Sequence, residues 1–232
     1  NSLMQIYRGD RLGIWMFAIG FPFAFVLLVN VYIDQNADLS LKPDLLTKWG
    51  WSADRSKISM TVRKNAKWHD GKPFTSADVK CTWDMLTGRS ETLKLRKNPR
   101  SSWYWNLEKV TTNGPAEVTF HLGQPQPSML ILLASGYSPV YSCHVPTAQM
   151  RTKPIGTGPF MLVQYQKDAI IRYKAFPQHW AGKAKIDDLI FSITPDASVR
   201  WAKLQKGECH VMPYPNPADL PAITAIYAQA VL

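Results

Sequence analysis

Five histidines are the first candidates for chemistry, because imidazole can act as a base or as a metal ligand near neutral pH. No two of them have the four-residue spacing that places two zinc ligands on one face of a helix. His69 precedes Asp70, but adjacent side chains in extended structure point to opposite faces, so the pair does not predict a catalytic dyad. We therefore predict no catalytic residue and no metal site, and interpret all five as structural or surface residues: His69, His121, His144, His179 and His210.

Three cysteines, Cys81, Cys143 and Cys209, are the next candidates. They are far apart and have no C-x-x-C spacing, which argues against a zinc site. In an oxidising compartment one pair could form a disulfide and leave the third thiol free. Three buried, reduced cysteines are equally compatible with the sequence.

The usual catalytic loops are missing from the sequence. It contains neither the G-x-S-x-G elbow nor the phosphate-binding G-x-x-x-x-G-K-[ST] loop. Gly156-Thr157-Gly158 cannot serve as a dinucleotide loop, because Pro159 lacks an amide hydrogen and a strand pattern follows. The glycines and prolines of Lys153–Phe160 instead predict a conformationally restricted corner in the scaffold of a binding protein.

The charge balance is strongly basic, with 27 lysines and arginines against 17 aspartates and glutamates and a net charge of +10. Such a charge favours acidic partners through long-range attraction. The densest basic run, residues 94–100, is short and lies in an expected loop without a groove-reading helix or a base-stacking module. We interpret it as a solvated surface and expect no nucleic-acid partner.

Several elements can be placed from hydrophobic periodicity and turn signals. Residues 57–64 alternate apolar and polar side chains, as a half-buried strand does. Thr75 and Asp78 form a variant capping box that begins a helix ending near Gly88. Further strands and helices are expected at residues 117–122, 128–135, 160–166, 169–176, 188–193 and 195–206, the last helix with Thr194 as N-cap and Pro195 as its first residue. This mixture predicts an α/β or α+β fold with a mainly mixed sheet.

Residues 89–115 are polar, basic and aromatic, and we expect an exposed excursion there. Its aromatic cluster of Trp103, Tyr104 and Trp105 could line a ligand cleft or pack into the core.

The segment from Leu12 to Ile33 carries no formal charge. As a helix it would reach about 33 Å, enough to cross a hydrocarbon core of about 30 Å. Arg8 and Arg11 precede it, which would leave the rest of the chain outside the cytoplasm. Pro22 and the strand-prone residues before Asp34 favour a buried core segment instead, and both interpretations remain open. We thus expect an apolar segment over residues 1–34, with membrane contact through residues 12–33, and a folded domain over residues 35–232.

Two blocks of the sequence resemble the family 5 extracellular solute-binding proteins of peptide and nickel ABC importers. The first block comprises Leu41–Trp49 and Val62–Val79. The second resembles the dipeptide-binding members most closely, and the resemblance extends over roughly Leu39 to Leu220. The second block comprises Lys153–Phe160, Tyr165–Asp168, Ile171–Phe176, Phe191–Arg200, Lys203–Lys206 and Cys209–Asp219.

This resemblance implies an incomplete lobe of a type II periplasmic binding protein that ends before the second lobe. The implied function is substrate binding for a peptide importer: the protein captures a dipeptide or oligopeptide in the periplasm and delivers it to ABC permease subunits in the inner membrane. No enzyme activity and no cofactor are implied. The alternative is a membrane-anchored structural or interaction subunit derived from such a lobe, without transport activity.

Two departures from the family pattern affect the site residues. In dipeptide-binding members, the cysteine matching Cys209 is expected to pair with one near the N-terminus, where this chain has its apolar run. The resemblance therefore favours Cys81 and Cys143 as the disulfide pair, if one forms. The Asp and Arg expected to hold the peptide termini belong to the second lobe, so no substrate-binding residue is assigned. We expect the 232-residue chain alone to bind peptide weakly or not at all.

Overall fold

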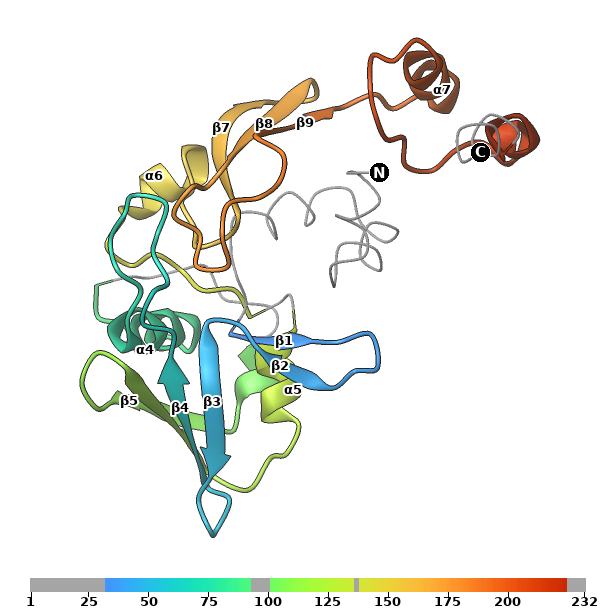
Figure 1. Ribbon diagram of the computed structural model, residues 1–232. Coiled ribbons are helices and arrows are strands. Elements are labelled where there is room, and N and C mark those ends of the chain that lie inside the picture. Colours follow the sequence, from blue (N-terminus) through green and yellow to red (C-terminus); the bar gives the residue numbers. More distant parts are fainter. Residues whose placement is uncertain (1–31, 93–100, 136–137, 225–232) are drawn as a thin grey trace.

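The computed structural model describes residues 32–92, 101–135 and 138–224, and most of them form two units with separate cores (Figure 1). We call them the four-stranded unit, residues 32–146 in their described parts, and the three-stranded unit, residues 157–192. The α/β class predicted from the sequence is confirmed. The expected mixed sheet is not found, because every described strand pair is antiparallel and the strands are divided among three sheets.

The four-stranded unit is built on a sheet with the strand order β3-β4-β6-β5. Its strands are β3 (Leu46–Trp51), β4 (Lys57–Val62), β5 (Leu107–Thr112) and β6 (Glu117–Leu122). A two-stranded sheet of β1 (Ile33–Gln35) and β2 (Leu41–Pro43) precedes β3.

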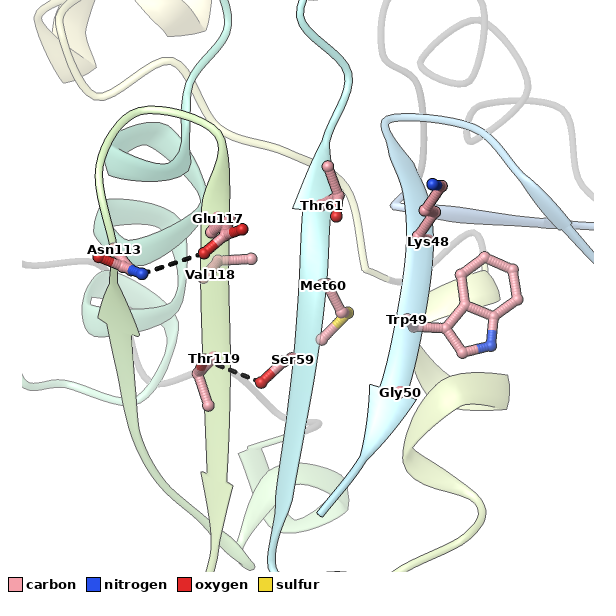
Figure 2. A pocket seen from close by; sticks show the side chains of 10 residues that line it. All are labelled: Lys48, Trp49, Gly50, Ser59, Met60, Thr61, Asn113, Glu117, Val118 and Thr119. Atoms are coloured by element: carbon pink, nitrogen blue, oxygen red, sulfur yellow. Dashed lines mark hydrogen bonds between the residues drawn. The ribbon is translucent and has the colours of Figure 1, made fainter.

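Each face of the four-stranded sheet follows from the period-two pattern of its strands. On β4, Ile58, Met60 and Val62 are buried and the residues between them are more exposed, as predicted. The opposite face is polar and open, and Figure 2 shows part of it across β3, β4 and β6. One face therefore forms the core and the other meets solvent.

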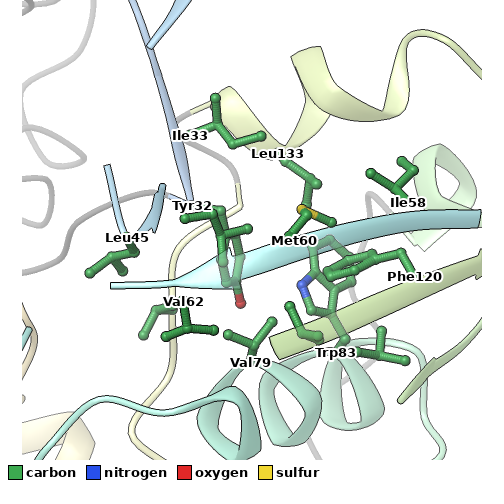
Figure 3. Close-up of a cluster of buried hydrophobic side chains, with 14 of the residues drawn as sticks. Tyr32, Ile33, Leu45, Ile58, Met60, Val62, Val79, Trp83, Phe120 and Leu133 are labelled. Atoms are coloured by element: carbon green, nitrogen blue, oxygen red, sulfur yellow. The ribbon is translucent and has the colours of Figure 1, made fainter. Parts of the chain in front are cut away.

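Two helices, α4 (Ser76–Leu86) and α5 (Met129–Ala134), contribute side chains to the core on the apolar face (Figure 3). The fully buried ring of Trp83 lies at its centre, with ring centroids 4.8 Å from Tyr104 and 5.5 Å from Phe120. The aromatic cluster is thus divided, since Tyr104 is buried while Trp103 and Trp105 are exposed.

The end of the apolar N-terminal run belongs to this core. Tyr32 and Ile33 are fully buried, and burial raises the pKa of the Tyr32 phenol. Residues 12–31, on which the expected membrane contact depends, lie outside the described residues. Among the helices that the structure does describe, none has the length and apolar character needed to span a bilayer.

The beginning and end of α4 agree with the sequence prediction. Thr75 and Asp78 form the capping box, in which the Thr75 backbone N–H donates to Asp78 Oδ2 at 2.8 Å. Gly88, two residues after the end of the helix, has a φ of 77°, a conformation that a side chain would strain.

The three-stranded unit has the strand order β7-β8-β9. Its strands are β7 (Phe160–Gln166), β8 (Ile170–Ala175) and β9 (Asp188–Ser192), and the predicted hairpin joins the first two. Its core is small and centres on four buried residues: Phe160, Ile171, Tyr173 and Ala175. The helix α6 (Thr147–Thr152), which was not predicted, connects the two units.

The last elements are α7 (Ala197–Gln205) and the 3₁₀ helix η2 (Pro217–Asp219), and neither contains a buried residue. Figure 1 shows α7 beyond the end of β9, away from the sheets. The predicted N-cap was wrong: Asp196, not Thr194, caps α7, and its carboxylate accepts a hydrogen bond from the Val199 amide at 2.9 Å. Strand β5 was not predicted. It lies within residues 89–115, where an exposed excursion was expected, and the 3₁₀ helix η1 (Ser101–Tyr104) lies there too.

Candidate functional site at the junction of the two units

The glycine- and proline-rich corner lies where the two units meet, and His69 of the four-stranded unit holds it. The Gly156 amide donates to His69 Nδ1 at 3.1 Å, and His69 Nε2 lies 2.9 Å from the Gly158 carbonyl oxygen. The His69 amide also donates to the Gly156 carbonyl at 2.9 Å. His69 of the four-stranded unit is therefore hydrogen-bonded, through its ring and its backbone amide, to the segment that leads into the three-stranded unit.

These contacts determine the state of the His69 ring. Nδ1 accepts a hydrogen bond, so the ring hydrogen must be on Nε2, which donates to the carbonyl of Gly158. Burial lowers the pKa of His69 to about 4, although the Gly158 carbonyl favours the protonated form. Both nitrogens are occupied, so this neutral ring positions the corner and is not available as a base. The sequence interpretation of His69 as a structural residue agrees with these contacts.

A second set of contacts joins the units through the loop after β8. The Arg63 guanidinium lies 3.7 Å from the centroid of the Trp180 ring, a cation–π geometry. Arg63 Nε also donates to the Asp44 carbonyl at 2.7 Å, which orients the guanidinium. Close by in sequence, Lys67 Nζ donates to Gln178 Oε1 at 3.1 Å. The contacts of Arg63 and Lys67 with this loop were not predicted, because nothing local in the sequence links residues more than a hundred positions apart.

The carboxylate of Asp70, the residue after His69, contacts His144 and Lys72. His144 Nε2 lies 2.9 Å from Asp70 Oδ2, and Lys72 Nζ lies 3.6 Å from the same oxygen. Burial alone would raise the pKa of Asp70, but hydrogen bonds from the Lys72 backbone and from His144 lower it overall. The carboxylate of Asp70 is therefore paired with His144 and Lys72, while the His69 ring is bonded to the corner.

A disulfide holds the loop that carries His144. Cys81 of α4 is bonded to Cys143, with their Cα atoms 6.4 Å apart, and Cys209 is a free thiol. The Tyr141 amide donates to Thr82 Oγ1 at 3.1 Å beside the bridge. The loop is therefore fixed to α4 both covalently and by hydrogen bonding.

The chemistry of the junction is that of a fixed support. Burial lowers the pKa of His179 in the loop after β8, and His121, away from the junction on the open face of the four-stranded sheet, lies 2.8 Å from Thr111 Oγ1. In the part of the chain that the structure describes, no three His, Cys, Asp or Glu side chains are grouped as a metal site requires. The described contacts hold backbone and rings in position and set up no acid–base pair with a nucleophile.

Comparison with known proteins places this arrangement in a family. The sequence profile of the bacterial extracellular solute-binding proteins, family 5 Middle, matches residues 40–230. The chain is 40% identical over 201 residues to the dipeptide-binding protein of Escherichia coli, an alignment covering 77% of this chain and 37% of that protein. It is 30% identical over 219 residues to the probable di/tripeptide-binding protein 5 of Pseudomonas aeruginosa, covering 84% of this chain and 41% of that protein.

Solved structures show the same fold. The dipeptide-binding protein of Pseudoalteromonas sp. SM9913 in complex with Met-Leu matches with a TM-score of 0.76 at 23% identity, over 85% of this chain and 43% of that one. HbpA2 of Haemophilus parasuis matches with a TM-score of 0.74 at 27% identity, over 86% of this chain and 43% of that one. The chain spans less than half the length of these relatives. It belongs to the family 5 bacterial extracellular solute-binding proteins.

Proposed function

We propose that this chain is part of the substrate-binding component of a peptide ABC importer. In this role it captures dipeptides or oligopeptides in the periplasm and delivers them to a permease in the inner membrane, without altering them. The observation that carries the proposal is the 40% identity over 201 residues with a dipeptide-binding protein. Two further relatives support peptide as the ligand class, since one has di/tripeptide in its name and the other was solved with Met-Leu bound.

The organisation of the described residues suits a binding role. We assign residues 35–232 to one lobe of a two-lobed binding protein and residues 1–34 to a separate apolar segment. The His69 and Arg63 contacts would hold the two units of the lobe in a fixed orientation, which lowers the entropy lost when a ligand is bound. The Cys81–Cys143 bridge fits an oxidising compartment such as the periplasm.

A transport assay tests this function in the cell. The gene is interrupted in a leucine auxotroph of the host bacterium, which is then grown on Ala-Leu or on free leucine. We expect growth and uptake of radiolabelled Ala-Leu to fall, growth on leucine to be unchanged, and both defects to be restored by the intact gene. Undiminished uptake of di-, tri- and tetrapeptides in the disrupted strain would rule out a role in peptide import.

Calorimetry on the purified chain then tests whether this lobe alone is sufficient to bind a peptide. With Ala-Leu, Met-Leu and a tripeptide, we expect heats too small for a micromolar Kd from the 232-residue chain. A polypeptide of the length of the relatives, containing this chain, should bind at least one of these peptides in that range. Micromolar binding by the 232-residue chain would contradict the assignment to a single lobe.

A further inference from the structure

A row of basic side chains crosses the open face of the four-stranded sheet. Lys57 of β4 is directly opposite His121 of β6, and His121 is directly opposite Lys109 of β5. These positions alternate with the buried residues Ile58 and Val110, so all three side chains are on the solvent side. We call Lys57, His121 and Lys109 the basic row.

The two lysines of the basic row flank His121 and are two strands apart. The pKa of His121 is lowered first by burial and then by Lys109 and Lys57, although Glu108 acts in the opposite direction. No ion pair of Lys57 or Lys109 with a carboxylate is found among the described residues. An anionic partner would therefore offer these two lysines the opposite charge that the described residues do not give them.

Beside the basic row runs a trough with short side chains. Gly50 on β3 is directly opposite Ser59, Ser59 is opposite Thr119, and Thr119 is opposite Thr111. A Cβ at Gly50 would meet no atom within 4 Å, and the Ser59 and Thr119 hydroxyl oxygens lie 3.3 Å apart (Figure 2). A groove of about 360 Å³ lies here, with Lys48 and Glu117 also in its lining. Hydroxyl donors are therefore exposed next to the lysines.

Lysines and hydroxyl groups are a donor set that can bind phosphate. A lysine ammonium binds phosphate as a point charge, and the basic row supplies two of them. The backbones of Lys57 and Lys109 are two strand spacings apart, about 10 Å, so they suit several phosphates side by side. A sheet face that is open to solvent can meet a planar array of such groups.

We propose that the basic row and its hydroxyl trough form a docking face for anionic phospholipid head groups at a bilayer surface. The family is extracellular, which places a membrane surface within reach, and the chain has a net charge of +10. Docking through this face of the four-stranded unit would keep a binding protein at the membrane surface, close to its permease.

Co-sedimentation with vesicles tests the docking face. The purified chain is mixed with vesicles of phosphatidylcholine alone, or with 30 mol% phosphatidylglycerol. Binding to the neutral vesicles measures any contribution from other parts of the chain. We expect stronger binding to anionic vesicles, and loss of the difference at about 1 M salt, where the Debye length is about 3 Å.

Two charge-matched double variants give the test its specificity. Lys57→Gln with Lys109→Gln should lower partitioning onto anionic vesicles roughly tenfold or more, given about fivefold for each lysine. Lys64→Gln with Lys167→Gln removes the same charge elsewhere and should leave partitioning within roughly twofold. The first variant should also unfold at about the same temperature as the unchanged chain, because it removes two exposed lysines that make no ion pair with a described carboxylate.

Three results would overturn the proposal. Equal losses in the two double variants would show attraction by net charge alone. Equal binding to neutral and anionic vesicles would exclude head-group recognition. Stabilisation by inorganic phosphate, or binding of polyglutamate, without binding to anionic vesicles would identify a small-anion or acidic-protein site instead.

Discussion

His69 is kept neutral by its surroundings, and this has a measurable consequence. Its pKa is about 4 in the folded chain, against an ordinary value of 6.5, so the unfolded chain takes up the proton first as the pH falls. The free energy of unfolding should therefore be insensitive to this residue above pH 6.5. Between pH 6.5 and pH 4 it should decrease by up to about 1.4 kcal/mol per pH unit.

Urea unfolding at several pH values checks this prediction against His69→Gln. The variant should be less stable than the unchanged chain by about 1–3 kcal/mol at pH 7.5, because a partly buried hydrogen-bond partner is lost. The difference between the two proteins should narrow as the pH falls toward 4. Parallel stability curves over that range would show that His69 does not titrate as described.

The Arg63–Trp180 contact can be isolated with a double-mutant cycle. Arg63→Ala and Trp180→Ala are measured separately and together, and we expect a coupling free energy of about 0.5–2 kcal/mol from the cation–π contact. Lys67→Ala paired with Trp180→Ala is the control, because Lys67 contacts Gln178 instead. A coupling no larger than that of the control pair would contradict a specific interaction.

At the scale of the elements, the disulfide between α4 and the loop that carries Cys143 should contribute to the stability of the fold. The bridge closes a loop with a sequence separation of 62 residues, so Cys81→Ser with Cys143→Ser should lower the free energy of unfolding by about 4 kcal/mol. Cys209→Ser should change it little. Thiol titration of the unfolded, unreduced protein should find one free thiol among its three cysteines. Three titratable thiols would show that the bridge does not form.

Elements whose signals are local could be predicted from the sequence. Strand β4 has strict alternation, α4 carries its own capping box, and the β7–β8 hairpin turns at Asp168, whose φ is 57°. Strand β5 was missed because a register shift between Leu107 and Lys109 breaks the alternation, so that Leu107 and Val110 are both buried. The N-cap of α7 was misplaced because Thr194 and Asp196 are both acceptable caps, and only the Asp196 side chain reaches an amide.

The junction could be anticipated only in part. The restricted corner at residues 153–160 was visible in the sequence, since glycine and proline limit the backbone directly. Its partner was not, because His69 and Gly158 are 89 residues apart and meet only through the fold. The antiparallel pairing of three separate sheets was missed for the same reason.

At the scale of the whole molecule, stability should be unevenly distributed. α7 has no buried residue, so its opening exposes little new apolar surface and should cost little free energy. In limited trypsin digestion followed by mass spectrometry, we expect cleavage at Lys203 and Lys206 well before cleavage at Lys57 or Lys109, which lie within strands of the four-stranded sheet. Equal rates at these four sites would contradict this order.

The three contacts at the junction also limit motion. His69, Lys67 and Arg63 join the four-stranded unit to Gly158, Gln178 and Trp180. Together with the Gly156 bonds to His69, these contacts oppose rotation of one unit against the other. Under the proposed function, the two units would then move together when a peptide is enclosed, and the hinge for that closure would lie outside this junction.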